Sequence, residues 1–300
     1  MNSTLSPELA FTLSEAQKAQ FERDGFLAVT GVFSPDEVAT LRQHFMDIQN
    51  EALDPNSPLR AHYKPLSLEE ANGDKLKHFP RIMHPARFDE MAMRYMIDSR
   101  IQAILSQLFG EEPLAAQSML YFKPPGAKGQ ALHQDNFYLN VSPGTCLAAW
   151  LSLDAADEEN GGMFMVPGSH KLPVLCPHLA DMTKSFTTEE VDIPEGMEAV
   201  QVPLGAGDVL FFNGSVIHGS FPNVSKDRFR RAFICHYVGD STRAMSGGYY
   251  PLWRFSGETL TREVAQGGSH SCGNEEWSDF QKSVTEFQRE HTAQSGGGLN

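Results

Sequence analysis

Residues 207–238 read GDVLFFNGSVIHGSFPNVSKDRFRRAFICHYV, and this stretch decides the fold. It contains three short apolar runs, at 208–212, 215–220 and 231–238, which are separated by residues that favour turns. Several short strands split in this way are typical of an antiparallel sandwich or barrel. Four more strands of this kind are predicted upstream, at 114–123, 145–154, 163–166 and 198–202.

The first hundred residues have the spacing of helices rather than strands. Ser34, Pro35 and Glu37 supply a cap, a first-turn proline and a capping-box glutamate, so a helix is predicted from there to about residue 50. Capping-box spacing also predicts a helix that starts after Ser14 and stops at Gly25, with a short strand at 26–29. The stretch 88–109 predicts one broken helix or two.

The chain is therefore expected to form a single domain of the α+β class with a mainly β core. Its helical part spans about 14–110, its β core about 114–240, and a C-terminal loop and helix about 241–292. The last helix is predicted from four apolar residues at helical spacing: Trp277, Phe280, Val284 and Phe287.

Composition excludes several classes of protein. The 300 residues include 38 acidic and 24 basic ones, for a net charge of −14, which disfavours a nucleic-acid partner. No apolar run approaches the roughly 20 residues of a membrane span. The N-terminus lacks a basic and apolar leader, so we expect a cytoplasmic protein without a membrane partner. The oligomeric state leaves no signal in the sequence.

The four cysteines, at 146, 176, 235 and 272, are widely scattered and include no CxxC pair. This spacing argues against a zinc cluster or a disulfide scaffold. Cys146 and Cys235 lie inside apolar runs and are expected to be buried. All four are predicted to be reduced, structural thiols.

Three residues carry the pattern of a metal site. His133 and Asp135 are predicted to lie at the start of a β segment and, two residues apart, to point the same way. With His218 on another strand, they would form the two-histidine, one-carboxylate triad of non-haem Fe(II) oxygenases. The alternative is a histidine that is hydrogen-bonded to a neighbouring carboxylate and has no metal.

Two polar residues follow His218 on the same part of the chain. Arg230 precedes the strand at 231–238, and a guanidinium pairs well with the far carboxylate of 2-oxoglutarate. Ser220 would face the same side as His218 and donate a further hydrogen bond. The alternative for Arg230 is a solvated cation beside Lys226, Arg228 and Arg231.

These segments together resemble the phytanoyl-CoA dioxygenase family of Fe(II)- and 2-oxoglutarate-dependent oxygenases. The resemblance covers about residues 20 to 240 and follows the family's order. It rests on QSMLYFKPPG (117–126), HQD (133–135), AAWLSLDAADEENGGMFMVPGSHK (148–171), GDVLFFNGSVIHGS (207–220) and NVSKDRFRRAFICHYV (223–238). It implies a double-stranded β-helix, which is a cupin-like jelly roll flanked by helices.

The resemblance also implies roles for individual residues. His133, Asp135 and His218 match the family's iron ligands, and Arg230 matches its 2-oxoglutarate clamp, with Arg228 as the alternative because the gap from His218 is one residue longer than usual. Ser220 matches a serine beside the last ligand. Positions that line the cosubstrate in the family are matched by Met119, Gln134 and Trp150.

Other residues are placed less closely by the pattern. Either Lys77 or Arg81 would contact the other end of the cosubstrate, or both are surface charges. His170 is expected to stabilise a turn and His236 to lie near the site. His78 and His84 would cover the mouth, and the pocket would be shaped by loops 53–87, 171–197 and 240–275. In the last loop, an aromatic group (Tyr249, Tyr250 and Trp253) and the neighbouring Arg254 would line a pocket or pack against the C-terminal helix.

The implied function is hydroxylation of an unactivated C–H bond in a small molecule, with Fe(II), 2-oxoglutarate and O₂, and with release of succinate and CO₂. Asp135 favours hydroxylation over halogenation, because related halogenases carry a small residue there. The substrate would be a metabolite, a natural-product intermediate or an acyl derivative. Three alternatives are kept: an acyl-CoA 2-hydroxylase of the same family, a cupin-type metalloenzyme without 2-oxoglutarate, and a silent barrel that binds a ligand.

Overall fold

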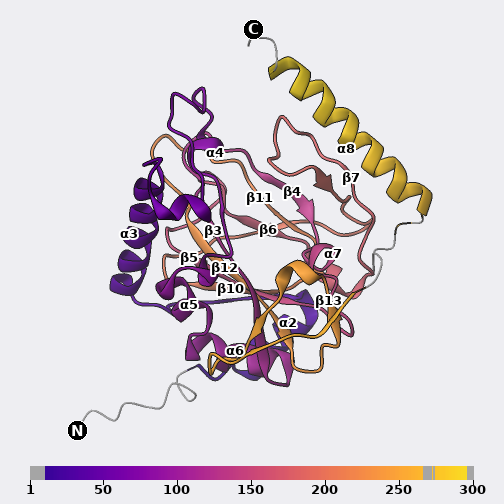
Figure 1. The fold of residues 1–300 in the computed structure, drawn as a ribbon. Helices are drawn as coiled ribbons and strands as arrows, with labels where there is room; N and C mark the ends of the chain where they lie inside the picture. Colours follow the sequence, from indigo (N-terminus) through magenta and orange to yellow (C-terminus); the bar gives the residue numbers. More distant parts are fainter. Residues whose placement is uncertain (1–10, 266–271, 273, 296–300) are drawn as a thin grey trace.

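A computed structural model describes residues 11–265, 272 and 274–295 (Figure 1). Short helices lie in the N-terminal half, and the longest helix follows the β core. The helices are α2 (Glu15–Asp24), α3 (Pro35–Ala52), α4 (Lys75–His78), α5 (Glu90–Met96), α6 (Ser99–Phe109), α7 (Asn136–Leu139) and α8 (Asn274–Ser295).

The strands are short, and most lie between residues 113 and 264. They are β1 (Phe26–Val29), β2 (Ile82–Met83), β3 (Pro113–Tyr121), β4 (Gln130–His133), β5 (Leu147–Ser152), β6 (Met163–Met165), β7 (His178–Leu179), β8 (Glu189–Glu190), β9 (Val200–Val202), β10 (Val209–Asn213), β11 (His218–Ser220), β12 (Ala232–Gly239), β13 (Ala244–Met245), β14 (Leu252–Trp253), β15 (Thr259–Leu260) and β16 (Glu263–Val264).

Two antiparallel sheets form the core. The larger has eight strands in the order β1-β10-β5-β12-β3-β14-β15, with β2 also paired to β3, and the smaller has the order β4-β11-β6-β9. Met163, Met165 and Val202 of the small sheet pack in one buried cluster with Trp150 and Ile234 of the large sheet. The two sheets therefore face each other as a jelly roll, which confirms the predicted fold class.

The register of the large sheet determines which side chains face inward. Ile234 lies opposite both Met119 and Trp150, and Trp150 lies opposite Leu210, so one row of side chains crosses four strands. All four belong to the cluster shared with the small sheet. Because successive strand residues point to opposite faces, the residues between them turn to the other side of the sheet.

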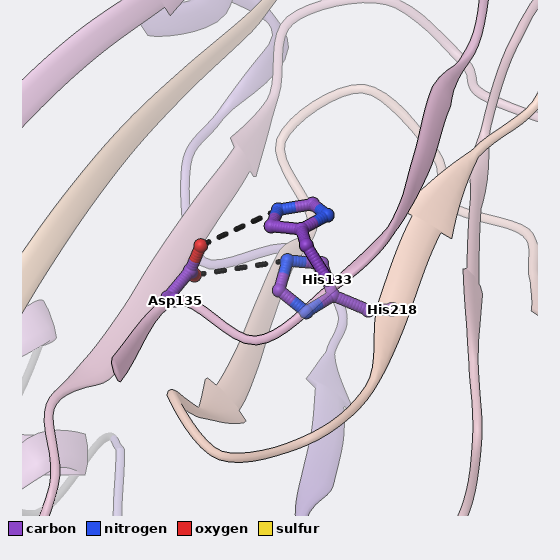
Figure 2. A group of neighbouring side chains, drawn as sticks. All are labelled: His133, Asp135 and His218. Atoms are coloured by element: carbon purple, nitrogen blue, oxygen red, sulfur yellow. Dashed lines mark ion pairs between the residues drawn. The ribbon is translucent and has the colours of Figure 1, made fainter. Parts of the chain in front are cut away.

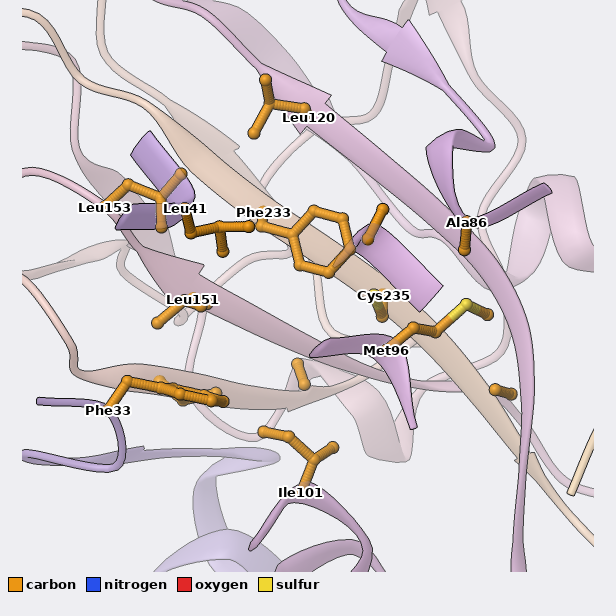
Figure 3. Packing of buried hydrophobic residues seen from close by; sticks show 14 of the residues in the cluster. Phe33, Leu41, Ala86, Met96, Ile101, Leu120, Leu151, Leu153, Phe233 and Cys235 are labelled. Atoms are coloured by element: carbon orange, nitrogen blue, oxygen red, sulfur yellow. The ribbon is translucent and has the colours of Figure 1, made fainter. Parts of the chain in front are cut away.

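That other side is covered by helices (Figure 3). Leu41 and Phe45 of α3 and Ile101 of α6 pack in one cluster with Leu151 and Phe233 of the sheet. The predicted capping box at Ser34 is present, and the stretch 88–109 forms two helices. The helical predictions for these segments are thus confirmed. In the part of the chain that the structure describes, no helix is long and apolar enough to cross a bilayer.

The cysteine prediction is half wrong. Cys146 and Cys235 are buried free thiols, as expected. Cys176 and Cys272 instead form a disulfide across 96 residues of chain. This bond joins the insertion after β6 to Cys272, a contact that cysteine spacing alone cannot reveal.

Candidate active site

The candidate metal ligands come from two neighbouring strands of the small sheet (Figure 2). His133 ends β4 and lies opposite His218, which begins β11. Asp135 follows the end of β4 in a helical backbone conformation, directly before α7. His133 was expected at the start of a strand that includes Asp135. The strand instead ends at His133, and the turn, not strand alternation, brings the carboxylate back to both imidazoles.

The three side chains are buried and converge. Asp135 Oδ1 lies 3.5 Å from His133 Nε2, and Oδ2 lies 3.7 Å from His218 Nε2. One donor atom from each residue lies within 4.8 Å of the others. These are the separations of donors that can share a single ion.

Hydrogen bonds select the histidine tautomer that metal binding requires. His133 Nδ1 lies 2.9 Å from the Ala131 carbonyl oxygen, and His218 Nδ1 lies 2.9 Å from that of Val216. A carbonyl only accepts, so both Nδ1 atoms donate and both Nε2 atoms keep a lone pair. Because both lone pairs lie near the Asp135 carboxylate, the donor set fits a divalent metal such as Fe(II).

The charge states fit the same role. Burial alone would raise the pKa of Asp135, but the neighbouring imidazoles of His218 and His236, together with the hydrogen bond from His236 Nε2, outweigh this effect. The pKa of Asp135 therefore lies well below its usual range. Burial, aided by the nearby His133, lowers the pKa of His218 to about 4. At neutral pH the carboxylate is ionised and His218 is neutral, as metal ligands are.

His236, which lies on the large sheet, forms a hydrogen bond with the Asp135 carboxylate. Its Nε2 lies 2.8 Å from Asp135 Oδ2, and the residue is buried on β12. This confirms the expectation that His236 lies near the site. A hydrogen bond to a ligating carboxylate fixes its orientation, which tunes metal affinity.

The triad lines a cavity of about 220 Å³. The most deeply buried lining residues define its inner end, and they include Arg230, Ser220, Trp150 and Met119. Arg230 is 2% exposed and its guanidinium carbon lies 5.2 Å from the centre of the Trp150 ring. Four residues predicted around the cosubstrate therefore lie together.

Arg228, the alternative clamp, lies elsewhere. Its guanidinium is bound to Asp157 and Glu159 on the surface, and its side chain is 37% exposed. It is absent from the residues that line the cavity. Of the two arginines, only Arg230 lines the cavity.

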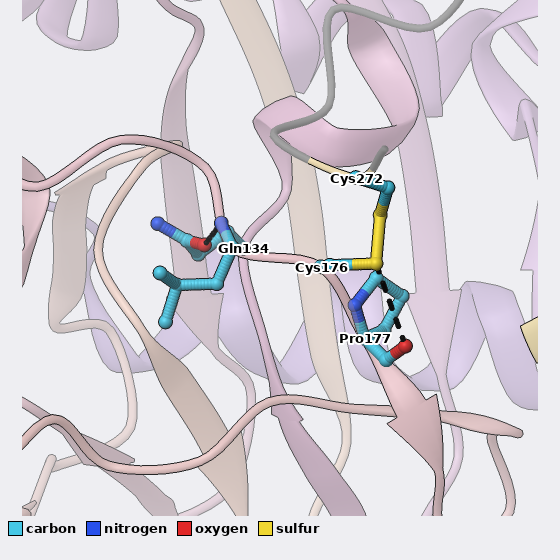
Figure 4. Close-up of a disulfide and its surroundings, with 5 residues drawn as sticks. Gln134, Cys176, Pro177 and Cys272 are labelled. Atoms are coloured by element: carbon cyan, nitrogen blue, oxygen red, sulfur yellow. Dashed lines mark hydrogen bonds between the residues drawn. A yellow bond between two sulfur atoms is a disulfide. The ribbon is translucent and has the colours of Figure 1, made fainter. Parts of the chain in front are cut away.

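Gln134 differs from its predicted place. Its side chain turns away from the large cavity: Nε2 donates to the Ser215 carbonyl, and Oε1 accepts from the Leu175 backbone N–H at 2.7 Å. The residue thus fastens the insertion that carries Cys176 to the metal-binding turn (Figure 4). Gln134 points away from the cavity because the strand ends at His133 and a turn follows. The turn orients the Gln134 side chain differently from a continuous strand.

The mouth of the cavity is built by the three predicted loops. Loop 53–87 contributes Arg81 and Met83, loop 171–197 contributes Thr187 and Glu189, and loop 240–275 contributes Tyr249. Arg81 Nη1 donates to the Tyr121 hydroxyl at 3.2 Å, whereas Lys77 is exposed and does not line the cavity. Burial and the nearby Glu189 carboxylate raise the pKa of Tyr138, which also lines the mouth.

The remaining predicted residues have structural contacts. His170 Nε2 bonds the Glu22 carbonyl, and His78 Nδ1 bonds that of Leu66. The His84 ring is tilted by 57° against that of Tyr249, with ring centres 6.3 Å apart. Of the aromatic group, only Tyr249 lines the cavity. Tyr250 donates to the Glu263 carbonyl, Trp253 is buried in the core, and Arg254 pairs with Glu112. The side chain of Trp277 lies outside the described residues.

Several cavity residues were missed by sequence reasoning. Tyr138 lies just past the metal-binding turn, and Glu189 lies in the insertion, where no motif marks either. Lys123 is completely buried behind the inner end of the cavity. Its signal was present in the sequence: a lysine that directly follows the apolar run SMLYF, where a charge is out of place.

A jelly roll with two histidines and a carboxylate facing its interior defines the class of non-haem iron oxygenases. The family model described as phytanoyl-CoA dioxygenase (PhyH) matches residues 21–232. The chain therefore belongs to the phytanoyl-CoA dioxygenase family.

Two curated relatives illustrate the similarity. Phytanoyl-CoA dioxygenase 1 of Oryza sativa subsp. japonica is 26% identical over 235 residues, which cover 76% of this chain and 83% of the relative. Peroxisomal phytanoyl-CoA dioxygenase of Rattus norvegicus is 26% identical over 282 residues, covering 90% and 80%.

Solved structures share the fold at lower identity. The epimerase SnoN, in complex with Fe³⁺, alpha ketoglutarate and nogalamycin RO, aligns with a TM-score of 0.60 at 23% identity, covering 85% of this chain and 95% of SnoN. EctD from S. alaskensis, with 2-oxoglutarate and 5-hydroxyectoine, aligns with a TM-score of 0.60 at 20% identity, covering 90% and 91%.

Proposed function

We propose that this protein is an Fe(II)- and 2-oxoglutarate-dependent dioxygenase that hydroxylates an unactivated C–H bond of a small molecule. In the overall reaction, 2-oxoglutarate, O₂ and R–H give succinate, CO₂ and R–OH, with one oxygen atom in succinate and one in the alcohol. One observation carries the proposal: the buried triad and the buried Arg230 line the same cavity.

The residues divide the task between them. His133, Asp135 and His218 would hold Fe(II), which supplies the redox chemistry toward O₂ when bound. Arg230 would bind the far carboxylate of 2-oxoglutarate through its terminal N–H groups. Apolar side chains around this site exclude water and so strengthen the ionic contact: Met119, Trp150, Phe212 and Ile234.

The mouth would select the substrate. Arg81 and Glu189 provide charges of both signs there, beside Tyr138 and Tyr249. The names of the curated relatives suggest an acyl-CoA as the second candidate. The net charge of −14 favours a small polar metabolite or natural-product intermediate instead, since the phosphates of CoA need nearby cations.

The test is a titration of the purified protein with Fe(II) and then with 2-oxoglutarate under anaerobic conditions. A weak visible charge-transfer band that needs both additions is expected. If iron binds and no band forms, a metalloenzyme without 2-oxoglutarate replaces this proposal. If no iron binds, the triad is not a ligand set. Succinate release then identifies substrates among candidate compounds.

A further inference from the structure

Lys123 is a charged residue in a place where charges are rare. It follows the end of β3, and the whole residue is 2% exposed. No carboxylate in the described part of the chain forms an ion pair with it. A buried ammonium without an acid partner is costly, so its retention calls for a function.

The ammonium is surrounded by three oxygen atoms. Nζ lies 2.8 Å from Ser220 Oγ, 2.5 Å from the Phe221 carbonyl and 3.4 Å from the Gly161 carbonyl. An ammonium only donates, so Ser220 Oγ must accept this bond. The hydroxyl hydrogen of Ser220 is then left to donate, and no described protein group accepts it. Since Ser220 lines the cavity, its hydrogen is available to a ligand there.

Arg230 and Lys123 donate hydrogen bonds to the same backbone carbonyl. Its Nε donates to the same Gly161 carbonyl at 3.0 Å, and its backbone N–H donates to the Lys123 carbonyl at 3.0 Å. Its two terminal nitrogens have no acceptor among the described residues. The guanidinium thus presents unused donors to the cavity beside the Ser220 hydroxyl.

The backbone of the loop at Gly161 packs closely against the Lys123 side chain. Gly161 has a φ of +89°, and a Cβ there would overlap with Lys123 Cδ. Its single carbonyl accepts from both Lys123 and Arg230, which holds two positive charges close together. Burial, and then the charge of Arg230, push the pKa of Lys123 well below its usual range. An anion at the inner end of the cavity would offset the charge of Arg230 and favour the charged form of Lys123.

We propose that Lys123 is a positioning residue for the cosubstrate. It fixes the Ser220 hydroxyl as a donor and adds a buried positive charge behind Arg230. The inner end of the cavity then selects a 2-oxo acid that carries a second, distal carboxylate. The inference rests on the proposed function and deepens it by explaining how the site distinguishes diacids from monoacids.

The test compares two acids that share the metal-binding head. 2-Oxoglutarate has a distal carboxylate, and 2-oxopentanoate does not. Their dissociation constants are measured anaerobically with Fe(II) from the charge-transfer band. In Lys123→Met, the dissociation constant of 2-oxoglutarate should rise roughly 10- to 100-fold. That of 2-oxopentanoate should stay within about twofold. Lys123→Arg, which keeps the charge, should recover most of the loss.

Two more variants keep the test decisive. Lys128→Met, at an exposed lysine that binds the Met182 carbonyl, is the control and should change neither constant. If Lys123→Met does not fold, Lys123→Gln replaces it. Ser220→Ala should independently raise the dissociation constant of 2-oxoglutarate about three- to tenfold and leave that of 2-oxopentanoate unchanged.

Three results would overturn the inference. They are an equal loss for both acids in the neutral Lys123 variants, no loss for either acid, or unchanged diacid binding in Ser220→Ala. A wild-type protein that gives no band with either acid would instead count against the proposed function. The two failures are therefore distinguishable.

Discussion

The two ends of the cavity are built in different ways. The inner end takes Met119, Trp150 and Ile234 from neighbouring positions in the register of the large sheet. Ser220 comes from the facing small sheet, where it lies opposite Met163. The mouth takes Arg81, Glu189 and Tyr249 from three separate loop segments. Under the proposed function, residues positioned mainly by the sheets would carry out the reaction, and loop segments, which tolerate sequence change, would contact the substrate.

The segments at the mouth are held by a few long-range contacts. Gln134 binds the backbone of the 171–197 insertion at Pro173 and Leu175, and the Cys176–Cys272 disulfide joins it to the segment before α8. Glu189 sits on a two-residue strand paired only with another short strand, β7. We therefore expect changes at the inner end to affect the cosubstrate and changes at the mouth to leave it bound.

The largest effect is expected at the metal ligands. Asp135→Ala should lower Fe(II) affinity and 2-oxoglutarate turnover roughly a thousandfold or more, because it removes the only anionic donor of the triad. Iron binding and succinate release measure this loss. Asp181→Ala, at an exposed carboxylate of the insertion, is the matched control. Full turnover in Asp135→Ala would remove the triad from the mechanism.

The next effect separates two arginines that are close in sequence. Arg230→Met should raise the Michaelis constant for 2-oxoglutarate about 100-fold, because it removes a buried charge-assisted contact. Arg228→Met should change it less than about twofold, since Arg228 pairs with surface carboxylates. Steady-state kinetics on both variants give the comparison. A larger rise in the Michaelis constant for Arg228→Met than for Arg230→Met would assign the carboxylate contact to Arg228. It would contradict the proposal that 2-oxoglutarate binds at the inner end of the cavity.

A smaller effect is expected from the support of the carboxylate. His236→Phe should weaken Fe(II) binding roughly 10- to 100-fold, because Asp135 loses the hydrogen bond that orients it. His236→Gln keeps an N–H donor and should recover part of the affinity. Calorimetric Fe(II) titration under anaerobic conditions distinguishes the two. Equal affinities in His236→Phe and the wild type would show that the turn alone fixes Asp135.

The smallest effect on the cosubstrate is expected at the mouth. Cys176→Ser breaks the bond that joins the insertion to the segment before α8, and it should lower stability by about 2–4 kcal/mol. The dissociation constant of 2-oxoglutarate should stay within about twofold of the wild-type value. Thermal unfolding and the charge-transfer titration measure the two quantities. A loss of 2-oxoglutarate binding comparable to that in Arg230→Met would show that the two ends are not independent.

Local sequence patterns predicted much of the fold. The capping box at Ser34, the pair of helices in 88–109 and the strands that became β3, β5 and β12 all follow from spacing within one segment. These features depend on backbone periodicity and nearby caps, which neighbouring residues determine. The triad was predicted from short motifs together with the resemblance to the phytanoyl-CoA dioxygenase family, because the His-x-Asp pattern alone also fits a histidine that only hydrogen-bonds to a carboxylate.

Contacts between distant segments were decided only by the tertiary structure. The turn that carries Asp135, the inward burial of Lys123 and the disulfide between Cys176 and Cys272 depend on how the two sheets close and where the insertion returns. A charge after an apolar run does not reveal which hydroxyl it will meet 97 residues later. The sequence by itself determined several strands of the core and the family, and it predicted the candidate metal ligands. Packing decided which polar groups lie together in the cavity, because burial leaves them no partners except one another and a ligand.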